Sequence, residues 1–381
     1  MDFSFSQEQE MLRQTLSRLL KEQIEPMIPE VERTDRFPVE AYDLMKQYGI
    51  TSVLVPEEYG GMGGNITSFC IVMQEIGKVF AGLGGNFGGH NGCIELIEEA
   101  GSDQLKEEYL GKVAKEGYLA AITLTEPNAG SDAASIKTRA VLDGDHYILN
   151  GTKCFISNGG LADFYCVFAV TDPAKRAGGI SLFVVDKDVK GLSQGKKEDK
   201  MGMKGAHVAE VIFEDVKVPK EKLVGAEGKA FYLVMTVFNG TRCAVGALAT
   251  GIAQGAIAHA LKYAQERVSF GKPIYQHQAL QFMIADMAMK TEAAEALVYK
   301  AASIYDSKQG SPAETARLAS MAKCFGSDVA MSVTSDAVQV FGGYGYMKDY
   351  PVERYMRDAK LTQIFDGTNQ IHRMVIARNL V

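Results

Sequence analysis

The hydrophobic pattern changes its period twice along the 381 residues of this chain, and this limits the fold more than any other feature. Over residues 1–118, apolar residues recur three and four positions apart, which is the spacing of a helix face. Over 119–228, short apolar runs are separated by turn residues, as in β-strands. From 229 to 381 the helical period returns. We therefore predict an α+β multidomain chain, in which an N-terminal α-helical domain and a C-terminal four-helix bundle flank a β-barrel or β-sandwich.

Several local signals refine the N-terminal part. Ser6 and Gln9 stand three residues apart just before an apolar run, which predicts a capping box at the start of the first helix. Further helices are predicted over 39–47 and 68–80. The segment 82–92 is rich in glycine, which lets two backbones approach closely. Its glycine spacing and the lack of a preceding strand argue against a dinucleotide-binding loop.

Turn residues organise the middle part. Asp143-Gly144 lies between two strand-like runs and predicts a tight hairpin, and Asn150-Gly151 predicts a second one directly after it. In the C-terminal part, apolar and alanine residues at helical spacing predict helices that pack closely in a bundle. The long helices are expected over 231–269, 276–309 and 314–341.

Composition argues against several functions. The net charge is −7 and no long basic run is present, so we expect no nucleic-acid partner. The chain has no run of 18 apolar residues, so we expect no membrane span. Its first residues lack the features of a signal peptide. The six cysteines are far apart and form no C-x-x-C pair, so we expect buried free thiols, a cytoplasmic location and no metal site.

Four segments near the C-terminus stand in a distinctive order: QVFGGYGY at 339–346, YPVER at 350–354, RDAK at 357–360 and IFDGTNQI at 364–371. Together they resemble the flavin-dependent acyl-CoA dehydrogenases. Three earlier segments extend the resemblance over essentially the whole chain: LTEPNAGSD at 124–132, KCFISNGG at 153–160 and ERVSFGKP at 266–273. The family's three-domain architecture agrees with the division read from the hydrophobic period.

The resemblance implies FAD as the cofactor. One set of residues is expected to lie along the flavin ring and the adjoining phosphates: Ile122, Leu124, Thr125, Gly130, Ser131, Phe155 and Ser157. In the family, Trp often stands where this chain has Phe155, which keeps an apolar plane and loses the indole donor.

A second set is expected to hold the FAD of a neighbouring subunit. It contains Arg267, Phe270, Gln278, Gln339 and Gly343, with Thr368 and Gln370 contacting the same cofactor from the catalytic loop. The planar guanidinium of Arg267 suits a pyrophosphate. No single chain would then hold FAD completely, so the resemblance implies a homotetramer built as a dimer of dimers.

Asp366 stands where the family has its catalytic base. By resemblance, its backbone N–H helps to polarise the thioester carbonyl and its carboxylate takes the α-proton, while the β-hydrogen leaves as hydride to FAD. Residues expected beside the acyl-CoA are Ser131, Arg242, Gly367 and Asn91, and His90 also falls where relatives line the acyl pocket. Electron-transferring flavoprotein is the expected electron acceptor.

The family usually has Glu where this chain has Asp366. The arm is shorter by one C–C bond, about 1.5 Å, and a misplacement of about 1 Å can cost roughly a hundredfold in rate. A shifted backbone would restore the reach, and so would a compact alicyclic or α-branched acyl group such as cyclohexanecarboxyl. The alternatives are a short-chain, butyryl-type dehydrogenase with no change of substrate, an enoyl-CoA reductase, and a nitroalkane-oxidase-like flavin oxidase.

Overall fold

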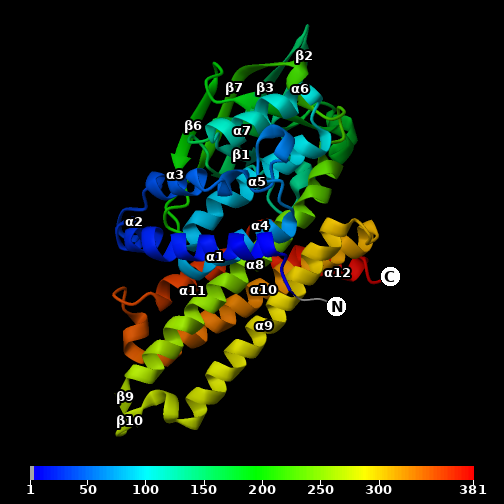
Figure 1. Ribbon diagram of the computed structural model, residues 1–381. Coiled ribbons are helices and arrows are strands. Elements are labelled where there is room, and N and C mark those ends of the chain that lie inside the picture. The colour runs from blue at the N-terminus through cyan, green and yellow to red at the C-terminus, as the bar shows by residue number, and fades with distance from the viewer. Residues whose placement is uncertain (1–3) are drawn as a thin grey trace.

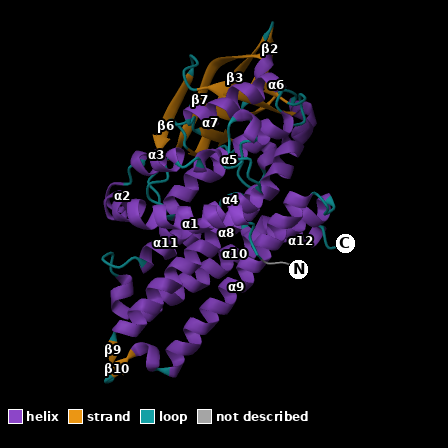
Figure 2. Ribbon diagram, in the orientation of Figure 1, coloured by secondary structure: helices purple, strands orange, loops and turns teal. Residues whose placement is uncertain are grey.

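The computed structural model describes residues 4–381 (Figure 1), so the first three residues of the predicted N-terminal domain lie outside the description. Helices form the first part, strands the middle and helices the last part. Figure 2 shows the strands of a large sheet gathered at one end of the molecule, with the long helices extending away from them toward a small two-stranded sheet at the other end. The first helices are α1 (Gln7–Leu19), α2 (Ile28–Thr34), α3 (Val39–Gln47), α4 (Ile66–Val79), α5 (Ala81–Ala100), α6 (Asp103–Leu105) and α7 (Gly111–Glu116).

The predicted capping box is present at the start of α1. The Ser6 hydroxyl accepts from the Gln9 backbone N–H at 3.2 Å, and the Gln9 side chain accepts from the Ser6 N–H at 3.1 Å. These two bonds satisfy amide groups that the first turn of a helix leaves without partners.

The glycine-rich segment forms most of α5, a 20-residue helix that the sequence pattern did not predict. Glycine costs about 1 kcal/mol relative to alanine in a helix. Close packing explains why it is tolerated here. A methyl group at Gly82 would lie 2.0 Å from the Lys204 carbonyl oxygen, and one at Gly84 would lie 2.7 Å from Leu248. Tertiary contacts therefore override the weak helical propensity of this segment.

Eight strands form the large sheet, with the order β6-β7-β3-β2-β4-β5-β8, and β1 pairs with β4 in parallel. The bounds are β1 (Ala120–Thr123), β2 (Arg139–Asp143), β3 (His146–Ser157), β4 (Phe164–Val170), β5 (Ile180–Asp186), β6 (Leu192–Lys197), β7 (Val208–Pro219) and β8 (Leu223–Val224). The hairpin at Asp143-Gly144 is confirmed, because β2 and β3 are antiparallel with Asp143 opposite His146.

The second predicted hairpin is wrong. Asn150 and Gly151 lie inside the continuous strand β3, where its pairing with β7 shifts register between Leu149 and Gly151. A methyl group at Gly151 would lie 2.3 Å from the Thr138 hydroxyl oxygen, so glycine marks a bulge with close contact rather than a turn.

The last part contains α8 (Ala230–Glu266), α9 (Gln278–Ser307), α10 (Pro312–Phe341), α11 (Val352–Thr362) and α12 (Asn369–Arg378). The three long predicted helices are confirmed, although α8 ends earlier than predicted, where the short strands β9 (Val268–Ser269) and β10 (Lys272–Pro273) begin. Within the described chain, α8 alone is long and apolar enough to pass a length-and-composition test for a membrane span. However, 72% of that stretch is buried inside the protein, as in a core helix.

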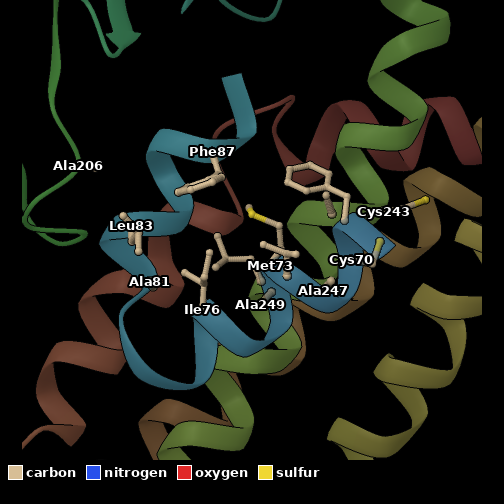
Figure 3. Close-up of a cluster of buried hydrophobic side chains, with 14 of the residues drawn as sticks. Cys70, Met73, Ile76, Ala81, Leu83, Phe87, Ala206, Cys243, Ala247 and Ala249 are labelled. Carbon is tan, nitrogen blue, oxygen red and sulfur yellow. The ribbon is translucent and has the colours of Figure 1, made fainter. Parts of the chain in front are cut away.

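The core lies where α4, α5 and α8 meet. Figure 3 shows Met73 and Ile76 of α4 beside Leu83 and Phe87 of α5, with Ala247 of α8 close by. All six cysteines are free and buried, as the sequence predicts. This packing fixes α5 and α8 against each other, and both helices contribute to the candidate site.

Candidate active site

Asp366 lies in the loop between α11 and α12 with a left-handed backbone. Its φ is +51°, and the following Gly367 has φ +94°. Aspartate adopts this region more readily than most residues, because its short polar side chain is tolerated there. Although its side chain is shorter than that of the family's usual Glu, aspartate therefore suits the backbone conformation of this loop.

Two buried side chains, His372 and Lys323, bond to the backbone of the loop that carries Asp366. The His372 Nε2–H donates to the Asp366 carbonyl at 3.1 Å, and Nδ1 faces the Ser320 hydroxyl at 3.3 Å. Because a carbonyl only accepts, Nε2 carries the proton. The Lys323 ammonium donates to the Gly367 carbonyl at 2.7 Å and to Asn369 Oδ1 at 3.0 Å. The carbonyl groups of Asp366 and Gly367 are thus both held in place by side chains.

Charge around the carboxylate is balanced between burial and two cations. The Asp366 side chain is partly exposed, but protein atoms surround it densely. Burial raises its pKa, and the positive charges of Lys323 and Arg242 oppose this rise. Burial lowers the pKa of Lys323 to about 8 and that of His372 to about 3, so the histidine is neutral at physiological pH. Arg242 is buried and donates to Asn239 Oδ1 at 2.7 Å. The structure therefore brings the predicted residues Asp366, Gly367 and Arg242 into one region.

Sequence reasoning missed Lys323 and His372. The available signal was a single lysine within a run of Ala, Met and Cys on α10, where a solvent-facing charge is not expected. The backbone amide of Asp366 was expected to point at a thioester oxygen. Among residues 4–381, no acceptor receives a hydrogen bond from this amide, which leaves it available as a donor.

The end of β1 lies close to β3, so the two segments expected to contact the flavin are neighbours in the structure. The Lys153 ammonium donates to the Leu124 carbonyl at 3.1 Å, and the Cys154 N–H donates to the Thr125 carbonyl at 3.0 Å. A methyl group at Gly89 of α5 would lie 3.9 Å from Ser157 Cβ and 4.0 Å from the Ile122 nitrogen.

The surface at these strand ends suits a planar ring. Phe155 has φ +56° and is 66% exposed, which is unusual for a strand aromatic beside a core. Gly130 and Ser131 are exposed, and a methyl group at Gly130 would meet nothing within 4 Å. An exposed apolar ring next to open backbone fits the isoalloxazine and phosphates of FAD.

A buried ion pair fixes the first of these strand ends. Lys153 Nζ lies 2.8 Å from Glu126 Oε1, and the Glu126 carboxylate also accepts from the Lys137 and Thr138 amides at 2.6 and 2.9 Å. Lys153 has no exposed surface, and burial lowers its pKa to about 8 against the opposing charge of Glu126.

Replacing Lys153 by Met should lower the free energy of unfolding by about 3–5 kcal/mol, because it leaves the Glu126 charge buried without its partner. Urea denaturation at pH 7 measures this change. Lys175→Met is the matched control, since its pair with Asp172 is exposed and should contribute little to stability. A loss for Lys153→Met no larger than that of the control would contradict the assignment.

The second predicted set lies elsewhere. Within the chain, Arg267 and Phe270 lie in the β9–β10 region, at the far end of α8 from the large sheet (Figure 1). The Arg267 guanidinium stacks over the Tyr344 ring with 5.5 Å to the centroid, and Phe270 is 94% exposed. All five members are exposed: Arg267, Phe270, Gln278, Gln339 and Gly343. By contrast, Thr368 and Gln370 lie in the Asp366 loop and at the start of α12, with Thr368 capping that helix.

Of the two residues expected at the acyl pocket, only Asn91 keeps a free polar atom. His90 is buried with both ring nitrogens engaged, since Nε2 contacts the Thr51 carbonyl at 2.8 Å and Nδ1 accepts from the Ala120 N–H at 3.1 Å. His90 therefore ties α5 to β1, and its expected place at the acyl pocket stays a prediction. Asn91 Nδ2 donates to the Phe87 carbonyl at 3.1 Å, and its Oδ1 is buried without a partner among the described residues.

Comparison with family models finds three matches that together cover nearly the whole chain. Residues 6–117, 121–216 and 228–381 match the acyl-CoA dehydrogenase N-terminal, middle and C-terminal domains. Cyclohex-1-ene-1-carbonyl-CoA dehydrogenase of Syntrophus aciditrophicus is 48% identical over 99% of this chain and 90% of that protein. Acryloyl-CoA reductase (NADH) of Anaerotignum propionicum is 46% identical over 100% of this chain and 96% of that protein.

Solved structures agree with this. Butyryl-CoA dehydrogenase from Megasphaera elsdenii superposes with a TM-score of 0.96 at 41% identity, covering 100% of both chains. A chain from a structure described as the electron transferring flavoprotein of Acidaminococcus fermentans gives 0.97 at 46% identity, again covering 100% of both chains. The FAD complex of PigA gives 0.94 at 27% identity, covering 100% of this chain and 99% of that one.

Proposed function

The chain belongs to the acyl-CoA dehydrogenase family and is an oxidoreductase acting on CH–CH bonds, and from this premise we propose that Asp366 is its catalytic base toward a compact acyl-CoA. The observation that carries the proposal is the left-handed Asp366, whose backbone is held by Lys323 and His372 and whose amide is free. This loop presents a carboxylate and an N–H donor from the same residue.

FAD is the cofactor proposed for the strand ends. Ile122 of β1 and the following Leu124 and Thr125 would line the ring, with Phe155 and Ser157 from β3 and Gly130 and Ser131 toward the phosphates. When bound, FAD would supply the acceptor for the β-hydrogen as hydride. The exposed Phe155 ring and the open backbone at Gly130 support this placement.

The protein's own residues account for the proton transfer. The Asp366 carboxylate would take the α-proton, while its free backbone N–H stabilises negative charge on the thioester oxygen. The positive charges of Lys323 and Arg242 oppose the rise that burial causes in the pKa of the carboxylate. Gly367, Ser131 and Asn91 remain the proposed contacts to the acyl-CoA.

The short arm of Asp366 favours a substrate whose α-carbon comes close, such as a cyclohexanecarboxyl or α-branched group. A relative that acts on a cyclohexene ring thioester, at 48% identity, supports this class. The experiment is anaerobic bleaching of the bound flavin by cyclohexanecarboxyl-, isobutyryl-, butyryl- and octanoyl-CoA. Preference for the cyclic or branched thioesters supports the proposal, and a clear preference for butyryl- or octanoyl-CoA contradicts it.

The reverse direction has a specific observation in its favour. The relative named acryloyl-CoA reductase is 46% identical over the full length of this chain. Reduction of the matching α,β-unsaturated thioester by the photoreduced enzyme, compared with oxidation of the saturated one by an acceptor dye, would determine which direction is faster.

The rate should depend on pH through Asp366. Because burial raises its pKa above the ordinary carboxyl value, kcat/KM should be low in acid, rise as pH passes through this raised pKa, and then level off. The same shift makes the protonated folded form relatively favourable, so its stability contribution is present at low pH and is lost as pH rises through the folded pKa. A pH profile of kcat/KM that follows an unperturbed carboxyl would contradict the assignment.

The exposed residues expected to hold the FAD of a neighbouring subunit are the basis for the proposed subunit partner. Arg267, Phe270, Gln278, Gln339 and Gly343 are proposed to hold the FAD of a neighbouring subunit in a homotetramer, with Thr368 and Gln370 on the catalytic loop. Electron-transferring flavoprotein is the proposed acceptor, supported by the similarity to a chain in a structure of that system. A cytoplasmic location is consistent with six free cysteines. Sedimentation of the FAD-loaded enzyme tests the tetramer.

A further inference from the structure

One face of α5 combines small residues with buried polar atoms that have no partner. Gly88, Asn91, Gly92 and Glu95 follow the i, i+3, i+4, i+7 spacing of a single helix stripe. Gly88 is buried, yet a methyl group there would meet nothing within 4 Å. This stripe therefore borders interior space beside α5.

Helix α8 completes the border. A methyl group at Gly92 would lie 2.7 Å from Ile122 Cδ1 and 3.9 Å from Thr241 Oγ1, and one at Gly240 would lie 3.0 Å from Glu95 Oε1. The stripe thus faces the end of β1 and the segment of α8 that contains Arg242, the residue whose charge acts on Asp366.

Three polar atoms on this border are unsatisfied among residues 4–381. They are Asn91 Oδ1, Glu95 Oε2 and Thr241 Oγ1, on side chains that are 0%, 9% and 3% exposed. Buried polar groups without partners cost about 1–3 kcal/mol each, so native proteins normally pair them. Atoms of this kind on facing helices indicate a polar group that binds between them.

The bonds already made determine what that group must offer. Asn91 Nδ2 donates to the Phe87 carbonyl, so its remaining oxygen requires a donor. Glu95 Oε1 accepts from the Tyr305 hydroxyl at 3.0 Å. Burial raises the pKa of Glu95 to about 8, so its second oxygen carries a proton at neutral pH and requires an acceptor. A hydroxyl group satisfies both requirements, because it donates and accepts.

We propose that the acyl group bound by this protein carries a hydroxyl remote from the thioester, recognised by Asn91, Glu95 and Thr241. The inference rests on the proposed function, since it places the acyl chain between α5 and α8. A purely hydrocarbon acyl group leaves these polar atoms unpaired, so it should bind less tightly than the same group with a hydroxyl in the right place.

The test compares matched thioesters on the FAD-loaded enzyme. Dissociation constants of cyclohexanecarboxyl-CoA and of 3- and 4-hydroxycyclohexanecarboxyl-CoA are measured by anaerobic flavin titration and by calorimetry. At least one hydroxylated thioester should bind about tenfold or more tightly than the parent, as expected for one satisfied pair of buried bonds. In Asn91→Leu and in Thr241→Val this ratio should fall toward one. The control Thr236→Val, on the exposed face of α8, should keep it.

The outcomes separate the two levels of the proposal. If the parent thioester bleaches the flavin and neither hydroxylated thioester binds more tightly, the hydroxyl inference is overturned while the proposed function stands. If no acyl-CoA bleaches the flavin of a correctly loaded enzyme, both fail. If the ratio survives in both variants, recognition by these residues is overturned. Flavin content and the visible spectrum confirm that each variant is folded.

Discussion

Replacing Asp366 by Asn should reduce the rate of flavin bleaching by an acyl-CoA by about a hundred- to ten-thousandfold, the range typical of a positioned general base. Asparagine keeps the size of the side chain and tolerates the left-handed backbone that this position requires (φ +51°), so the loop should keep its shape. What is lost is the ability to take the α-proton. Anaerobic stopped-flow spectroscopy with cyclohexanecarboxyl-CoA measures the effect.

Asp43→Asn is a suitable control for that experiment, because Asp43 is exposed on α3. The variant of Asp366 should still bind FAD and should still bind acyl-CoA, which calorimetry can measure. Bleaching by Asp366→Asn at a rate within threefold of the unmodified enzyme would remove Asp366 from its role as base.

Lys323→Met should lower kcat by about a hundredfold, although Lys323 is not among the residues proposed to contact the substrate. The change removes the ammonium donor from the Gly367 carbonyl and from Asn369 Oδ1, which among its described partners keeps only the Ser327 hydroxyl at 3.2 Å, so the loop loses two of the bonds that position it. A shift of about 1 Å in the neighbouring carboxylate is enough for a loss of this size. It also removes a positive charge that lowers the pKa of Asp366.

The second effect distinguishes Lys323 from a merely structural residue. Without the positive charge of Lys323, the acid limb of the kcat/KM profile should move to higher pH. Lys323→Arg keeps a positive charge, so its profile should stay close to that of the unmodified enzyme. Lys360→Met is the matched control, since Lys360 is exposed and bonds only to Gln363 among the described contacts. An unchanged pH profile in Lys323→Met would contradict the role assigned to this charge.

The fold could be predicted where one periodic signal dominates. The long helices of the bundle carry apolar residues at helical spacing for 30 residues or more, and their existence follows from that spacing. The glycine-rich helix α5 could not be predicted, because glycine disfavours a helix in isolation and only close packing against neighbours such as Leu248 makes it favourable. The signal at Asn150-Gly151 fits a hairpin and a bulge equally well, and pairing with β7 decides between them.

The site shows the same limit. The motif around Asp366 is local, so the sequence alone is enough to propose Asp366 as the base, with Gly367 beside it. Lys323 and His372 reach the loop from α10 and α12, and their function depends on which way two helices face. Similarly, the sequence gives no sign that the ring nitrogens of His90 bond to Thr51 and Ala120, and only the structure shows these contacts.

The glycines of α5 also determine how this enzyme could be made more heat-resistant. Exchanging glycine for alanine inside a helix is a standard route to stabilisation, worth about 1 kcal/mol per site. Most of these positions offer no room for it, since a methyl group at Gly82, Gly84 or Gly92 would collide with a neighbour. Gly88 and Gly89 do have room, since a methyl group would meet nothing within 4 Å at Gly88 and nothing nearer than 3.9 Å at Gly89. Filling Gly88 would narrow the interior space beside Asn91. This gain in thermal tolerance would therefore restrict which thioesters the enzyme accepts.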